Sequence, residues 1–144
     1  MKKIFLILLL FVSILLLFGC SEEISEIAYN NLITSLNNMN FKVTVEDVEK
    51  SILQGQRKWL TIKDNENISV YIYKSDKEME KDASYVSEDG CSYNNGNEAI
   101  NISWVSYPHF FKKDNIIVLY VGDDLEVINA LKKIMGSQFS GFLE

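Results

Sequence analysis

The sequence predicts an α+β protein, with an antiparallel sheet of about four to six strands and helices on one face in a two-layer arrangement. Three observations support this prediction. Several short segments alternate apolar and polar residues, which is typical of half-buried strands. Three other segments repeat apolar residues at every third or fourth position, which indicates amphipathic helices. Asp-Asn pairs and glycines separate these segments and mark turns.

An apolar helix of a different kind precedes this domain. Lys2 and Lys3 come before residues 4–18, in which Ser13 is the only polar side chain. The run is shorter than the roughly 20 apolar residues that a membrane-spanning helix needs, and polar sequence follows directly after Cys20. The layout is that of a secretory signal helix, which would export the rest of the chain. An uncleaved signal anchor with an incidental cysteine is the alternative.

The four residues Leu17-Phe18-Gly19-Cys20 end this segment. They resemble the lipobox of bacterial lipoproteins, in which a small residue precedes a cysteine that is acylated and becomes the first residue of the mature protein. The resemblance implies cleavage between Gly19 and Cys20 and a diacylglyceryl group on Cys20. Two or more acyl chains anchor a protein stably. The chain then divides into a signal peptide (1–19), a lipidated cysteine with an amphipathic helix (20–40), and an extracytoplasmic α+β domain (41–144).

Charge and cysteine content narrow the function further. Without residues 1–19 the chain has 12 basic and 20 acidic side chains, so its formal charge is 12 − 20 = −8. This charge argues against nucleic acid as a partner and against additional electrostatic attraction to an anionic bilayer. If Cys20 carries a lipid, Cys91 is the only thiol left and no intramolecular disulfide can form. The single domain must be stable through its own core.

The first half of the domain reads as helix, strand, hairpin. Apolar residues recur at every third or fourth position from residue 24 to residue 39, which predicts one face of an amphipathic helix. They are Ile24, Ile27, Ala28, Leu32, Leu36 and Met39. Residues 41–45 alternate as a short strand, and residues 51–63 read as a second strand with a bulge or turn near Gly55. A polar turn at 64–67 is followed by a strand of β-branched and aromatic residues at 68–73. The two strands and the turn between them predict a hairpin.

The second half begins with another predicted helix. Ser75 or Asp76 can cap a helix with an apolar stripe at Met79, Ala83 and Val86. A loop is predicted at 87–97 and a strand at 100–107, with Pro108 marking a strand end, edge or bulge. Residues 116–121 form a continuously apolar, central strand. A last helix is capped by Asp123 or Asp124 and stops at Gly136.

The two halves also share a local pattern. Residues 63–71 and 113–120 both begin Lys-Asp-Asn, lead into an apolar strand, and are followed by a helix with an acidic cap. The similarity fits either two ββα repeats or convergent turn chemistry, because Asp-Asn turns are common in hairpins.

The segments 104–113 and 117–122, with the later Gln138-Phe139, contain the pattern PHF…KK…IVLYVG. This pattern resembles a group of uncharacterised lipoproteins and exported proteins of Gram-positive bacteria. The resemblance implies life outside the cytoplasm, in a Gram-positive envelope with the lipid in the outer leaflet of the cell membrane. It implies no activity, cofactor or ligand.

Aromatic side chains are the strongest candidates for a binding surface, because aromatic rings beside a polar rim are the usual anchors of an interface. The alternative for each of them is core packing. The candidates are Trp104, Tyr107, His109, Phe110 and Phe111, with Trp59 as a further aromatic residue.

The sequence offers little support for a catalytic site or a metal site. Cys91 and His109 could form a thiol-imidazole pair, but no local signature supports one, and an incidental thiol and a structural histidine are the alternatives. No zinc-type spacing exists, and the oxygen-rich loop 88–97 does not match an EF-hand. We therefore expect a cell-surface binding domain without a cofactor, not an enzyme, whose envelope ligand or partner the sequence does not name. An immunity- or inhibitor-type envelope lipoprotein is the alternative, and a thiol enzyme comes third.

Overall fold

The structure, a computed structural model, describes residues 24–142. The predicted signal peptide and Cys20 lie outside the described residues. Within this range, no helix is both long enough and apolar enough to cross a membrane.

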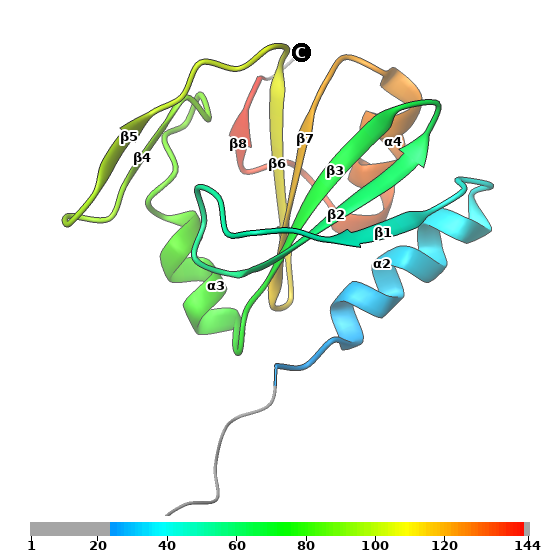
Figure 1. Cartoon of the computed structure of the whole chain (residues 1–144), viewed down its shortest axis with the longest axis horizontal. Coiled ribbons are helices and arrows are strands. Elements are labelled where there is room, and N and C mark those ends of the chain that lie inside the picture. Colours follow the sequence, from blue (N-terminus) through cyan, green and yellow to red (C-terminus); the bar gives the residue numbers. More distant parts are fainter. Residues whose placement is uncertain (1–23, 143–144) are drawn as a thin grey trace, which may run out of the picture.

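The centre of the molecule is an open, fully antiparallel sheet in the order β1-β2-β3-β7-β6-β8 (Figure 1). This confirms the predicted α+β class. The six strands are β1 (Thr44–Asp47), β2 (Gln56–Lys63), β3 (Glu66–Ile72), β6 (Pro108–Lys113), β7 (Ile116–Val121) and β8 (Ser140–Gly141).

Two hairpins with Asp-Asn turns form the middle of the sheet. Asp64 and Asn65 connect β2 to β3, and both adopt positive φ angles, of 26° and 84°. Asp114, with φ 50°, begins the equivalent turn between β6 and β7. Asp and Asn tolerate positive φ better than other non-glycine residues, which explains their place in these turns. The hairpins join through antiparallel pairing of β3 with β7.

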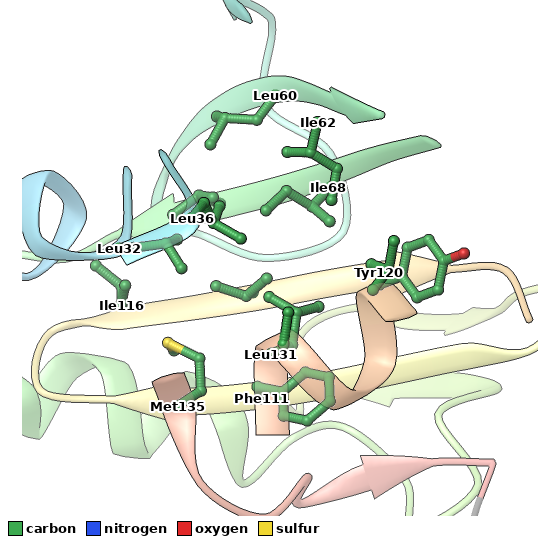
Figure 2. Packing of buried hydrophobic residues seen from close by; sticks show 14 of the residues in the cluster. Leu32, Leu36, Leu60, Ile62, Ile68, Phe111, Ile116, Tyr120, Leu131 and Met135 are labelled. Carbon is green, nitrogen blue, oxygen red and sulfur yellow. The ribbon is translucent and has the colours of Figure 1, made fainter. Parts of the chain in front are cut away.

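Helices α2 (Ile27–Asn38) and α4 (Leu125–Met135) cover one face of this sheet. The Asp124 carboxylate caps α4 by accepting from the backbone N–H groups of Glu126 and Val127. Figure 2 shows the core beneath these helices, where fully buried leucine and isoleucine side chains each contribute about 1.5–3 kcal/mol. The labelled members of this core are Leu32, Leu36, Leu60, Ile62, Ile68, Phe111, Ile116, Tyr120, Leu131 and Met135. Helix α2 therefore belongs to the same folded unit as the sheet.

The third helix, α3 (Asp76–Ala83), lies on the opposite face, whereas the sequence led us to expect the helices on one face. Its residues Met79 and Ala83 pack with Tyr71 and Tyr73 of the β3 end in a second core. The physical reason is that β3 is buried on both faces: its isoleucine and valine row lies under α2 and α4, and its tyrosine row under α3. The two ββα units therefore send their helices to opposite faces and are not equivalent.

A long excursion, residues 84–107, separates α3 from β6. It contains a small two-stranded sheet, β4 (Ser92–Asn94) and β5 (Ala99–Asn101), which projects from the main sheet (Figure 1). The strand expected at 100–107 is thus only three residues long, and regular structure resumes at Pro108, the first residue of β6. Proline lacks a ladder donor and is tolerated at a strand start. Residues 48–55 likewise form a loop, and the strand expected from 51 begins at Gln56.

Candidate functional site

Two hollows among the described residues have contrasting chemistry. The first, which we call the aromatic groove, has a volume of about 890 Å³ and lies where β6 begins and β8 ends. Three separate segments line it: 87–91, 102–108 and 141–142. Its apolar lining residues include Ile102, Trp104, Tyr107, Pro108 and Phe142.

The groove exposes aromatic rings that are held in place. Tyr107 is 49% exposed and stacks on Phe142, 42% exposed, with ring centroids 4.2 Å apart. The indole Nε1 of Trp104 donates to the Gly90 carbonyl at 2.9 Å, and its ring packs edge-on against Phe110. Stacked or edge-on aromatic pairs contribute about 0.5–1.5 kcal/mol beyond burial. The rings are therefore ordered as well as accessible.

Backbone contacts fix the walls of the groove. Gly141 N–H donates to the Glu88 carbonyl at 2.9 Å, and Phe142 N–H donates to the Pro108 carbonyl at 2.8 Å. Gly141 has φ +107°, and a Cβ placed there would lie only 2.1 Å from the Pro108 oxygen. Only glycine fits this close approach. The chain thus brings β8 and the loop at 87–90 against the start of β6.

The rim of the groove is acidic, because Glu88 and Asp89 are exposed and line it. The Asp89 carboxylate accepts from Ser87 Oγ at 2.5 Å and from the Cys91 backbone N–H at 2.9 Å. Both hydrogen bonds lower the pKa of this carboxyl, and the bond from Ser87 has the larger effect. The rim therefore carries negative charge at neutral pH.

Three of the five sequence candidates do not reach this surface. His109 is 2% exposed, and its ring nitrogens lie 2.9 Å from Gln138 Oε1 and 3.2 Å from the Gly122 carbonyl oxygen. Phe110 and Phe111 are fully buried, one in each core. Consecutive residues of a strand point to opposite faces, so a sheet covered on both sides buries both rings. Of the predicted surface, only Trp104 and Tyr107 remain.

The structure does not bring Cys91 and His109 together as a nucleophile and base. Cys91 is exposed at the groove, with its Sγ 3.5 Å from its neighbour Asp89's carbonyl oxygen. Both ring nitrogens of the buried His109 face other partners. Within residues 24–142 no group of three or more His, Cys, Asp or Glu side chains is placed to hold a metal ion.

The second hollow, which we call the basic pocket, has a volume of about 710 Å³. It lies between α3, the loop at 48–55, the start of β2, the end of β3 and the projecting β4-β5 hairpin. Its cationic lining residues are Lys50, Arg57, Lys74 and Lys81.

A buried carboxylate, Asp82, forms part of the basic pocket and was not anticipated. Its Oδ2 accepts from the Gln54 backbone N–H and from Tyr73 Oη, both at 2.7 Å, and its Oδ1 accepts from Tyr93 Oη at 2.6 Å. Asp82 is only 4% exposed. A signal was present in the sequence: Asp82 is spaced from Met79 and Ala83 so that all three share one helical face.

The two tyrosines act as permanent donors to this carboxylate. Burial, then the hydrogen bond to Asp82, raises the pKa of Tyr93 to about 12. Burial and the charge of Asp82 raise the pKa of Tyr73 still further. Both hydroxyls are therefore protonated at physiological pH and hold the excursion to α3 and β3.

Comparisons with protein-family models, with curated proteins and with solved structures found no match to this chain.

Proposed function

We propose that this chain is a lipid-anchored binding protein of the extracytoplasmic face, and that the aromatic groove binds an apolar peptide segment that carries a positive charge. Cys20 bears the anchor and the folded domain bears the site. The observation that supports this most directly is the exposed Tyr107–Phe142 stack beside Trp104 in a groove with a fixed backbone.

The chemistry of the groove favours such a ligand. Ordered aromatic rings lose little conformational entropy on binding and are the commonest energetic anchors of interfaces. The ionised Asp89 and the neighbouring Glu88 favour a lysine or arginine next to the apolar part of the ligand. Cys91 lines the groove but has no chemical role in this proposal.

The position of the groove suits a tethered protein. Pro108, at the groove, pairs with Val121 at one end of β7, whereas Ile116 at the other end pairs with Ile72. Next to Ile116, the Asn115 side chain donates to the Ser25 carbonyl, where the described chain begins. Five residues of β7 at ~3.4 Å each separate these ends by about 17 Å. Figure 1 shows the start of β6 and the start of α2 at opposite ends of the molecule. A chain anchored at Cys20 would therefore direct the groove away from the bilayer.

A peptide selection tests the groove. Random ten-residue peptides displayed on phage are selected on the chain from residue 20 with Cys20→Ser. We expect enrichment of aromatic or aliphatic residues beside lysine or arginine, and at least ten-fold weaker affinity for Tyr107→Ala. Leu125→Ala is the matched control, because Leu125 is 54% exposed on α4 and does not line the groove. Absence of enrichment, or equal binding to Tyr107→Ala, would refute the proposal that the groove binds peptides.

The anchor is tested separately by the intact mass and detergent partition of the chain made in a Gram-positive host. We expect the wild type to lose residues 1–19, to gain a diacylglyceryl mass and to partition with detergent, and Cys20→Ala to do none of these. A chain that keeps its apolar segment and behaves like the variant would overturn the anchor.

A further inference from the structure

The basic pocket concentrates positive charge in an acidic protein. Its lining includes the four cations named above and two carboxylates, Glu78 and Asp82, which gives a local formal charge of 4 − 2 = +2. The whole chain has a formal charge of −6. The local sign is therefore opposite to that of the molecule.

The cations of this pocket are available to a ligand. Lys50, Lys74 and Lys81 are exposed, and none of the three forms an ion pair with another residue in the described part of the chain. The Arg57 guanidinium donates to Ser69 Oγ, and its Cζ lies 5.1 Å from the centroid of the Trp59 ring. These two contacts hold the guanidinium in one orientation. Both oxygens of Asp82 already accept hydrogen bonds from within the protein. The lysines are thus the groups most open to an incoming anion.

The pocket lies at the end of the molecule where the chain emerges from the predicted anchor. Ile24 lines the pocket, and Ile24 follows Cys20 by four residues. At ~3.5 Å per residue, these residues can span at most about 14 Å. Ile27, in the first turn of α2, is 71% exposed and supplies an apolar side chain at the same end. A lipid on Cys20 would hold this end against the bilayer surface.

We propose that the basic pocket binds the phosphate of an anionic phospholipid headgroup in the membrane that anchors the chain. Lysine ammonium groups bind phosphate as point charges, and each basic residue near an anionic surface strengthens attachment. Asn95, Asn97 and Gln54 also line the pocket and can hydrogen-bond a headgroup hydroxyl. The contact orients the domain on its anchor and holds the aromatic groove outward.

Net charge alone would keep the domain away from an anionic bilayer. A formal charge of −8 after cleavage predicts repulsion from an anionic bilayer, and Glu22, Glu23 and Glu26 add to that repulsion near the anchor. Attraction must therefore come from the local group of lysines, and only when the pocket faces the membrane. Because the Debye length is about 8–10 Å at physiological salt, nearby charges outweigh distant ones.

The proposal rests on the proposed anchor for its orientation, but its test does not need the lipid. The chain from residue 20 with Cys20→Ser is mixed with phosphatidylcholine vesicles that contain or lack phosphatidylglycerol, and bound protein is measured by co-sedimentation. We expect binding only with phosphatidylglycerol, and weaker binding as salt rises.

Two double variants of equal charge separate the pocket from bulk charge. Lys74→Gln with Lys81→Gln removes two pocket cations, and we expect a fall in vesicle affinity of about ten-fold or more. Lys42→Gln with Lys63→Gln is the matched control at the far end of the strands, where Lys63 pairs with Asp124 beyond the end of β7. We expect the control to change affinity less than two-fold. No binding by the wild type, or an equal loss in both doubles, would overturn the proposal.

A soluble probe distinguishes a membrane headgroup from a free phosphate compound. We expect glycerol 1-phosphate to perturb the amide resonances of the pocket and to compete with vesicles at high concentration. If it binds the pocket while phosphatidylglycerol vesicles do not bind, the source is a free phosphate and the membrane proposal fails. None of these results depends on lipidation of Cys20 or on peptide binding in the groove, so each proposal can fail alone.

Discussion

The aromatic groove and the basic pocket are built by opposite means, although one excursion of the chain contributes to both. Residues 87–91 and 102–108 line the groove, and Tyr85, Tyr93, Asn95 and Asn97 line the pocket. The groove is held by backbone hydrogen bonds and by the close approach of the chain at Gly141. The pocket is held by the side chain of Asp82, which accepts three hydrogen bonds. We therefore expect the groove to be sensitive to an added Cβ and the pocket to the loss of a carboxylate.

The largest effect is expected from Asp82→Ala. The change leaves two buried tyrosine hydroxyls and the Gln54 N–H without their acceptor, and each unpaired buried group costs about 1–3 kcal/mol. We expect the free energy of unfolding to fall by about 4 kcal/mol in urea titrations. The exposed neighbour Glu78→Ala is the control and should change it by less than about 0.5 kcal/mol. Similar losses for both variants would show that the carboxylate does not hold the pocket.

Gly141→Ala should affect the groove. The new Cβ would lie 2.1 Å from the Pro108 oxygen at φ +107°, so β8 must move. We expect a loss of about 2 kcal/mol, faster hydrogen exchange at residues 139–142, and loss of peptide binding without loss of vesicle binding. Gly136→Ala is the control, because Gly136 has φ +94° but nothing within 4 Å of its added Cβ. With ψ −161°, this backbone conformation is nearly restricted to glycine, so the change should cost about 1–3 kcal/mol, but it should leave the groove intact.

High pH should loosen the pocket before the groove. The pKa of Tyr93 rises from 10.0 to about 12 on folding, so the folded state holds this proton more tightly than the unfolded state. The resulting stability is complete below pH 10 and is lost as pH rises towards 12. Urea titrations from pH 9 to 12 should show this fall, and Tyr93→Phe should show a shallower one. An equally steep fall in the variant would assign the loss to other groups.

The smallest effect is expected from Cys91→Ser. The thiol is exposed. Within residues 24–142, its sulfur has one hydrogen-bond partner, the carbonyl oxygen of Asp89. The free energy of unfolding should change by less than about 0.5 kcal/mol, and the affinity for selected peptides by less than two-fold. A large loss of peptide affinity would contradict a purely steric role for this residue.

The repeating patterns of the sequence were sufficient to predict most helices and hairpins. The Asp-Asn turns, the apolar run of β7 and the capped α4 each follow from local chemistry that the tertiary structure retains. The sequence did not predict which face of the sheet α3 covers, because tyrosines such as Tyr71 and Tyr73 can lie on a solvent-exposed face of a strand or on a buried one. In the structure Tyr71 is fully buried and Tyr73 is 4% exposed, so both faces of β3 are core.

The exposure of each candidate aromatic side chain could be predicted only in part, for a related reason. An aromatic residue in a strand can pack or protrude, and the choice depends on whether the sheet has one covered face or two. Tyr107 protrudes because residues 102–107 leave the sheet, whereas Phe110 is inside it. Phe142 was missed because it contacts Tyr107 only through tertiary folding and no sequence period connects them. The basic pocket was missed because its lysines come from separate segments.

The two edges of the sheet differ in how they avoid pairing with another molecule. On one side, β6 is covered by β8, which is only two residues long. On the other side, β1 is exposed along all four residues, and two of them, Glu46 and Asp47, are acidic. Like charges placed side by side repel, which discourages a second copy from adding its own β1 there. If the proposed anchor on Cys20 holds many copies on one surface, this charged edge would keep neighbouring copies from joining into a continuous sheet.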